Sequence, residues 1–334
     1  MATQIPSNPT PAPLKLAPLK LPAREIPVPT TVSAEARTFL ATPRPPFPEW
    51  PALGDTAAWR EAVARSNAIF APIHEEHRRQ FDGTLEERKL AGFALYEARP
   101  NTIPARNRDR VLLFLHGGAY VFGGGSLAGT GALPIAGAAG YRTYSPDYRM
   151  PPDHPFPAAL DDAVASYREL LKSTPANRIG IVGLSAGGGL AAAMVLKARE
   201  IGLPLPGAAV LLTPEADLTE SGDTFVTNVD LDIVLKKPMM RLNQLYAANA
   251  DLRNPYLSPV FGDFSKGFCP TFLQSGTRDL LLSNTVILHR ALRRANIEAE
   301  LHVWEAMPHA GFFGAPEDAE LLAEQLRFLD RHLG

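Results

Sequence analysis

The sequence of 334 residues has a single cysteine, Cys269, so an intramolecular disulfide is impossible and an oxidising compartment is not required. A catalytic thiol is the more specific interpretation of Cys269. Its place between Phe268 and Pro270, at the start of an apolar run, instead predicts a buried side chain. Net charge is also small, because 33 Lys and Arg oppose 35 Asp and Glu to give −2. No block of basic residues stands out, so we expect no nucleic-acid partner and no anionic-membrane partner.

Long apolar runs are missing as well. No stretch approaches the ~18 apolar residues that a membrane-spanning helix needs, so we expect no membrane span. The first residues lack a charged leader followed by an apolar run, and prolines interrupt each short apolar stretch there. This pattern argues against a signal peptide and favours a soluble, cytoplasmic protein.

The chain divides into regions of different composition. Residues 1–50 are rich in proline and lack periodicity, which predicts an extended or polyproline-like N-terminal extension. Residues 51–85 contain a helix-like spacing of apolar positions over 55–80, which predicts a helical cap segment. Residues 86–334 have the pattern of an α/β domain. A long interval with patchy helical signal interrupts that domain and predicts a cap insertion around 215–265.

Short apolar runs alternate with helical patterns in the third region. The expected strands are 90–97, 110–115, 141–146, 178–184, 208–213, 271–275 and 299–304, and the expected helices are 157–172, 187–201, 283–296 and 316–332. Strands that alternate with amphipathic helices predict an α/β fold with a mostly parallel central sheet, flanked by helices on both faces.

The strongest chemical motif is the segment GLSAG at 183–187, which follows an apolar strand pattern and precedes a helix of small residues. The G-x-S-x-G pattern alone is weak. Between a strand and a helix it is typical of a nucleophile elbow, which lifts the Ser185 hydroxyl beyond the end of the sheet. The bland alternative is a small-residue turn without chemical consequence. We favour Ser185 as a nucleophile.

A second motif, HGGA at 116–119, directly follows the strand pattern VLLFL. Glycines let backbone N–H groups approach a ligand, so Gly117 and Gly118, together with the N–H of Ala186, are the expected oxyanion hole. The alternative is a flexible glycine-rich loop, including one for phosphate. No phosphate-binding Gly-x-x-x-x-Gly-Lys-Ser/Thr pattern is present.

The partners of a serine nucleophile should follow it in the order acid, then histidine. Asp279 comes just after the strand pattern FLQSG, and His309 comes just after LHVWE. Both positions lie past the carboxyl ends of expected strands, where open α/β sheets place their ligand sites. We therefore expect Ser185, Asp279 and His309 to form a catalytic triad, with Asp217 as a weaker rival for the acid.

These motifs resemble those of the bacterial hormone-sensitive lipase family of esterases, also called family IV, which has the α/β-hydrolase fold. The segment DYRMPPDHPFPAA at 147–159 is similar to a further motif of that family, and the likeness covers roughly residues 85–334. The resemblance implies hydrolysis of short to medium acyl esters by a serine carboxylesterase without a cofactor. It also implies a helical cap over the site and a homodimer formed through an edge strand.

Three positions depart from the family pattern. Ala119 stands where many members have a third glycine, and Leu184 stands where Asp or Thr is commoner before the serine. Glu215 stands where members often have Trp. The carboxyl of Glu215 either assists His309, or contacts substrate, or hydrogen-bonds backbone N–H groups as an ordinary loop residue. We favour the last.

Other candidates are weaker. His74 and His77 are spaced three apart on an expected helix, whereas zinc proteases use HExxH, so we expect two exposed histidines and no metal site. A non-catalytic receptor on the same fold is disfavoured because receptors of that kind usually lose a triad member. A peptidase or amidase remains chemically close, and an epoxide hydrolase or dehalogenase would need Asp in place of Ser185.

Overall fold

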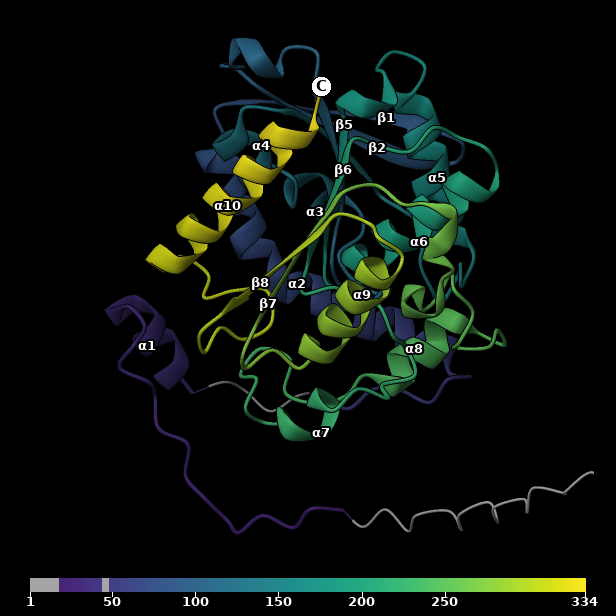
Figure 1. The fold of residues 1–334 in the computed structure, drawn as a ribbon. Helices are drawn as coiled ribbons and strands as arrows, with labels where there is room; N and C mark the ends of the chain where they lie inside the picture. The colour runs from purple at the N-terminus through teal and green to yellow at the C-terminus, as the bar shows by residue number, and fades with distance from the viewer. Residues whose placement is uncertain (1–17, 44–47) are drawn as a thin grey trace, which may run out of the picture.

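The computed structural model describes residues 18–43 and 48–334, and the strands of that part of the chain form one sheet of eight (Figure 1). The spatial order is β1-β2-β4-β3-β5-β6-β7-β8. The strands are β1 (Gly83–Leu90), β2 (Phe93–Pro100), β3 (Val111–Leu115), β4 (Arg142–Pro146), β5 (Ile179–Leu184), β6 (Ala208–Leu212), β7 (Thr271–Gly276) and β8 (Ala299–Trp304). β1 pairs with β2 and β2 with β4 in antiparallel fashion, and all pairs from β4 to β8 are parallel. The expected mostly parallel sheet is confirmed.

Helices cover both faces of this sheet (Figure 1). The α-helices of the described residues are α1 (Ala34–Ala41), α2 (Thr56–Gln80), α3 (Ser126–Thr130), α4 (Leu133–Ala139), α5 (Ala158–Leu170), α6 (Ala186–Glu200), α7 (Thr224–Thr227), α8 (Met240–Ala247), α9 (Leu282–Arg294) and α10 (Pro316–His332). Alternate residues of a strand point to opposite faces. Leu113 of β3 accordingly packs in the core with α5, α6 and α9, whereas its neighbours Leu112 and Phe114 pack in the core with α4 and α10.

One expected strand is wrong in its bounds. The run 90–97 was expected to be a single strand, but β1 ends at Leu90 and β2 begins at Phe93. Ala91 and Gly92 both have positive φ, 48° and 97°, as a two-residue hairpin turn requires. β1 itself was not expected, because its sequence GTLEERKL is charged and mostly exposed.

The N-terminal region also differs from expectation, because α1 replaces part of the extended chain predicted for residues 1–50. Ser33 caps this helix by accepting a hydrogen bond from the N–H of Ala36, and the Ser33 backbone N–H donates to Glu317 of α10 at 2.7 Å. Ala36 and Leu40 pack in the same core as α10. Residues 1–17 and 44–47 of the predicted extension lie outside the described residues.

A cluster of apolar side chains joins α2 and the β6–β7 insertion to loops that follow strands β3 and β7. We call it the cap cluster, and its buried members are Trp59, Ala62, Ala119, Val121, Phe122, Phe225, Leu235, Met239, Leu242, Leu280 and Leu281. Since those loops lie at the carboxyl ends of parallel strands, the cap cluster covers the edge of the sheet where α/β folds place their sites.

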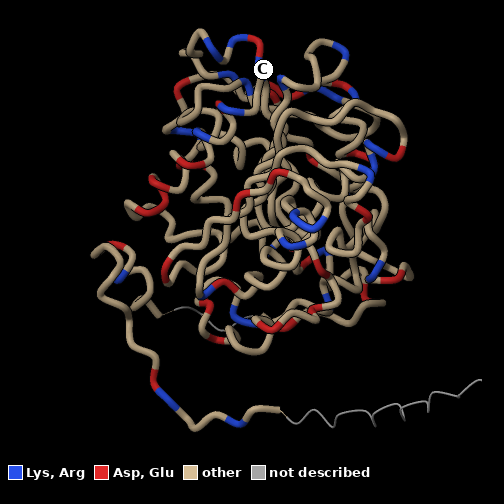
Figure 2. Tube along the Cα trace, in the orientation of Figure 1, with Lys and Arg blue, Asp and Glu red and all other residues tan. Residues whose placement is uncertain are grey.

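Positively and negatively charged residues are interspersed along the chain in Figure 2, in keeping with the small net charge. In the part of the chain that the structure describes, no helix combines the length and the apolar character needed to cross a bilayer.

Candidate active site

Ser185 stands at the sharp turn between β5 and α6. Its backbone has φ 57° and ψ −123°, a conformation that side-chain-bearing residues rarely adopt. The turn closes so tightly that a Cβ on Gly183 would lie 2.2 Å from the carbonyl oxygen of Gly187. A Cβ on Gly187 would lie 2.0 Å from the carbonyl oxygen of Leu115. The two glycines of the motif are therefore required by backbone packing.

The HGGA loop after β3 lies directly against this turn. A Cβ on Gly117 would stand 3.2 Å from the Cβ of Ser185. The loop is fixed from behind, since His116 Nδ1 donates to the carbonyl of Gly117 at 2.8 Å and the Tyr148 hydroxyl donates to the carbonyl of His116 at 2.7 Å. Ala186 is the first residue of α6, where backbone N–H groups have no acceptor within the helix.

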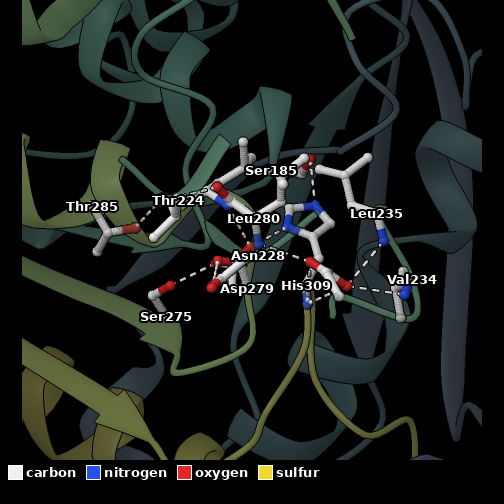
Figure 3. Close-up of polar contacts among 12 residues, drawn as sticks. Ser185, Thr224, Asn228, Val234, Leu235, Ser275, Asp279, Leu280, Thr285 and His309 are labelled. Atoms are coloured by element: carbon white, nitrogen blue, oxygen red, sulfur yellow. Dashed lines mark hydrogen bonds and ion pairs between the residues drawn. The ribbon is translucent and has the colours of Figure 1, made fainter. Parts of the chain in front are cut away.

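The structure brings Ser185, His309 and Asp279 into one hydrogen-bonded chain (Figure 3). His309 Nε2 lies 2.9 Å from Ser185 Oγ, and His309 Nδ1 lies 3.0 Å from Asp279 Oδ1. A carboxylate only accepts hydrogen bonds, so Nδ1 carries the proton and Nε2 is free to accept one from the serine hydroxyl. Asp279 is fully buried, and Ser185 is 8% exposed.

The chain also resembles proteins of a known family. A family model described as alpha/beta hydrolase fold matches residues 112–313. The chain belongs to the α/β-hydrolase family. The expected fold class is confirmed.

Individual relatives show which branch of this family the chain resembles. An acetyl-hydrolase of Streptomyces hygroscopicus is 38% identical over 208 residues, which is 62% of this chain and 69% of the relative. The crystal structure of an esterase, E25, is 35% identical with a TM-score of 0.89, covering 95% of this chain and 99% of that one. An esterase of the bacterial hormone-sensitive lipase family is 30% identical with a TM-score of 0.74, covering 90% of this chain and 99% of that one. The resemblance to that family is confirmed, and the protein is a carboxylic ester hydrolase.

The electrostatic setting of the hydrolase favours a charged histidine. Burial lowers the pKa of His309, but the hydrogen bond to Asp279 and the negative charges of Asp279 and Asp232 outweigh burial and raise this pKa above its usual value. The same charges stabilise the protonated form of the His309 imidazole.

Glu215 does not behave as we expected. Its backbone is tied to the site, because its N–H donates to the carbonyl of Ser185 at 2.9 Å and its own carbonyl accepts from the Tyr120 hydroxyl at 3.0 Å. Both carboxyl oxygens, however, are buried without a hydrogen-bond partner among the described residues, so the favoured role of bonding backbone N–H groups is wrong. Burial, and then the charge of Glu220, raise the pKa of this carboxyl to about 8, and the proximity of His309 lowers it in part. Glu215 is therefore mostly neutral at pH 7.

Replacing Glu215 by glutamine is expected to stabilise the esterase in a pH-dependent way. The carboxyl titrates at its ordinary value of 4.5 when unfolded and at about 8 when folded, so the folded state binds the extra proton between these values. Its contribution to stability is present below the unfolded value and is lost as pH rises through the folded one. The melting temperature of Glu215→Gln should therefore match wild type near about pH 5 and exceed it by several degrees near about pH 9.

Thermal unfolding followed by circular dichroism at the two pH values measures this difference. Other buried carboxyls titrate in both proteins and cancel. Glu320→Gln on α10 is the matched control, because Glu320 is exposed and should show no difference at either pH. An equal gain at both pH values for Glu215→Gln would contradict the assignment of a neutral buried acid.

The weaker candidates of the sequence lie elsewhere. The Asp217 carboxyl accepts hydrogen bonds from Thr219 and Ser221, and no bond joins it to His309. Cys269 is buried as expected, and burial raises the pKa of its thiol to about 12. His74 and His77 are half-buried rather than exposed, and His74 Nδ1 lies 2.8 Å from the Thr130 hydroxyl of α3. The described residues include no cluster of His, Cys, Asp and Glu suited to a metal ion.

Two side chains near the triad were not predicted from the sequence. Asn228 and Asp232, both buried in the β6–β7 insertion, hydrogen-bond the backbone around Asp279 and His309. They lie in the segment NVDLD, which matches no motif. The available signal is their spacing of four residues, repeated back to Thr224, which places three polar side chains on one face if the segment is helical.

Proposed function

We propose that this protein hydrolyses short to medium acyl esters through a covalent acyl-enzyme on Ser185, with His309 as general base and Asp279 as the acid that orients it. One observation carries the proposal: His309 lies between the Ser185 hydroxyl and the Asp279 carboxylate at 2.9 and 3.0 Å. A nucleophile, a base and an orienting acid within hydrogen-bond reach define this chemistry.

In the first half-reaction, the Ser185 oxygen attacks the ester carbonyl carbon while His309 Nε2 takes the hydroxyl proton. The carbonyl oxygen becomes an oxyanion, for which the N–H groups of Gly117, Gly118 and Ala186 are the proposed donors. When the C–O bond to the alcohol breaks, His309 returns its proton to the leaving oxygen. The acyl group is then bonded to Ser185.

In the second half-reaction, His309 takes a proton from water, whose oxygen attacks the acyl carbon. Collapse of this intermediate releases the carboxylic acid and returns the proton to the Ser185 oxygen. Asp279 keeps the proton on Nδ1 throughout and stabilises the imidazolium in both steps.

Two observations support a small acyl group. The cap cluster covers the carboxyl edge of the sheet and Ser185 is only 8% exposed, which favours a small acyl group over a long one. The Streptomyces relative is named for acting on acetyl groups. We infer that α2 and the β6–β7 insertion form a cap that limits the size of the acyl group. They fall in the regions 51–85 and 215–265, where the sequence predicts a cap segment and a cap insertion.

Rapid-quench mass spectrometry on p-nitrophenyl esters from acetate to palmitate tests the proposal. Acid quench during turnover of the short esters should give protein heavier by one acyl group, with the gain on the peptide that contains Ser185. The steady-state rate should be highest between acetate and hexanoate and fall toward palmitate. Turnover without any acylated peptide would mean direct attack by water, and a maximum at palmitate would overturn the acyl-length assignment.

A further inference from the structure

The β6–β7 insertion presents three buried side chains to the loop that carries Asp279. Thr224 is the first residue of α7, Asn228 is its C-cap, and Asp232 follows four residues later. The backbone N–H of Asn228 bonds to the carbonyl of Thr224, and that of Asp232 bonds to the carbonyl of Asn228 at 3.0 Å. This helical spacing puts the three side chains on one face of the segment.

Thr224 and Asn228 hold the backbone on either side of the acid (Figure 3). The Thr224 hydroxyl donates to the carbonyl of Leu280 at 2.7 Å. Asn228 Nδ2 donates to the carbonyl of Asp279 at 2.8 Å and to that of Thr277 at 3.2 Å. The carbonyl groups around Asp279 are thus held by the insertion.

Asp232 extends the contact to the histidine. Its carboxyl accepts from the backbone N–H of Leu280 at 2.8 Å, and both of its oxygens accept from the backbone N–H of His309 at 3.2 and 3.3 Å. It also accepts from Val234 and Leu235 within its own loop, at 2.9 and 3.0 Å. One fully buried carboxyl therefore joins the insertion, the acid loop and the histidine loop.

We propose that Asp232 is a positioning residue of this active site, which fixes the His309 backbone against the Asp279 loop and places a negative charge beside the imidazole. The inference rests on the proposed roles of Ser185, Asp279 and His309. It also links the insertion to the triad, because the same carboxyl accepts hydrogen bonds from the insertion and from the loops that carry Asp279 and His309.

Asp232 is one of three carboxyl groups that face His309. The titratable groups that face His309 are Asp279 from the loop after β7, Asp232 from the insertion and Glu215 from the loop after β6. Burial, and then the charge of Asp279, raise the pKa of Asp232 to about 6, and His309 and the backbone N–H donors oppose that rise. Asp232 is thus mostly ionised at pH 7, where Glu215 is mostly neutral.

The test compares Asp232→Asn with Asp230→Asn on p-nitrophenyl butyrate. Asparagine keeps the size of Asp232 but has one acceptor oxygen, so some of the backbone N–H groups lose their partner. We expect kcat to fall ~10–100-fold with little change in KM, because small misplacements of catalytic groups cost about this much. The acid limb of the kcat/KM profile should move to lower pH, because a negative charge beside His309 is gone. Asp230 is exposed two residues away, and Asp230→Asn should match wild type in both measurements.

Asn228→Leu separates position from charge, and it keeps the inference testable if Asp232→Asn does not fold. It removes the donors to the Asp279 loop without changing charge, so kcat should fall while the acid limb stays in place. A fall in kcat for Asp232→Asn with an unmoved acid limb would overturn the proposal in favour of an ordinary structural role. Wild-type kcat for Asn228→Leu would also overturn it.

Ser185→Ala in the same assay distinguishes this inference from the function on which it rests. An active Ser185→Ala protein would contradict both the proposed function and the positioning role of Asp232. An inactive Ser185→Ala protein together with wild-type kcat and pH profile for Asp232→Asn would remove the positioning role alone.

Discussion

Ser185→Ala is expected to lower kcat for p-nitrophenyl butyrate by ~10⁴-fold or more, with the fold intact. The Ser185 hydroxyl is the group that His309 Nε2 contacts at 2.9 Å, and alanine leaves no oxygen there to attack the carbonyl. Alanine keeps the Cβ, so the elbow keeps the same backbone environment. The Ser185 side chain also makes no capping bond to α6, so the helix loses nothing.

Steady-state kinetics and thermal unfolding of the same preparations test this expectation. Ser173→Ala is the matched control, because Ser173 is an exposed serine in the loop after α5 and should leave both measurements unchanged. An unchanged melting temperature in Ser185→Ala with the large loss of kcat assigns the loss to chemistry. Residual activity within tenfold of wild type would mean that another group attacks the ester, and the acyl-enzyme proposal would fall.

Much of the fold was predictable because buried strands and helices leave a pattern of apolar residues in the sequence. β3 and β5 are continuous apolar runs, as strands covered on both faces require, and their bounds were predicted to within one residue. β1 was not predictable in this way. Its side chains are largely exposed at the edge of the sheet, and what makes it a strand is its pairing with β2, which no local pattern records.

The site residues also fall into two groups, those that local sequence patterns predict and those that depend on tertiary contacts. The triad residues lie within five residues of the end of a strand and come in the order Ser, Asp, His, so position in the chain was enough to propose them. Asp232 lies 47 residues before Asp279 and 77 before His309, in a segment whose helix, α7, has four residues. Its importance comes from tertiary contacts with two distant loops. The predicted role of Glu215 was wrong for a related reason. A sequence does not show whether the carboxyl of a loop residue lies near a hydrogen-bond donor.

Asp279→Ala is expected to lower kcat/KM by ~10⁴-fold, because His309 loses the group that fixes its tautomer and stabilises its cation. Asp279→Asn is expected to cost less, ~10²–10³-fold, for a reason specific to this site. The backbone N–H of Leu281 donates to Asp279 Oδ1 at 2.9 Å, the same oxygen that accepts from His309. An amide nitrogen there would oppose two donors, so the asparagine oxygen should take that place.

The other end of the amide also fits. Ser275 Oγ donates to Asp279 Oδ2 at 2.5 Å, and a hydroxyl reverses by rotation to accept from an NH₂ group. Asparagine should therefore keep the proton on His309 Nδ1 and lose only the negative charge, which moves the acid limb of kcat/KM to lower pH. The dependence of kcat/KM on pH, measured for Asp279→Asn and Asp279→Ala, tests this expectation. If Asp279→Asn is as impaired as Asp279→Ala, the amide has turned its nitrogen toward His309, and the Leu281 N–H does not control the tautomer.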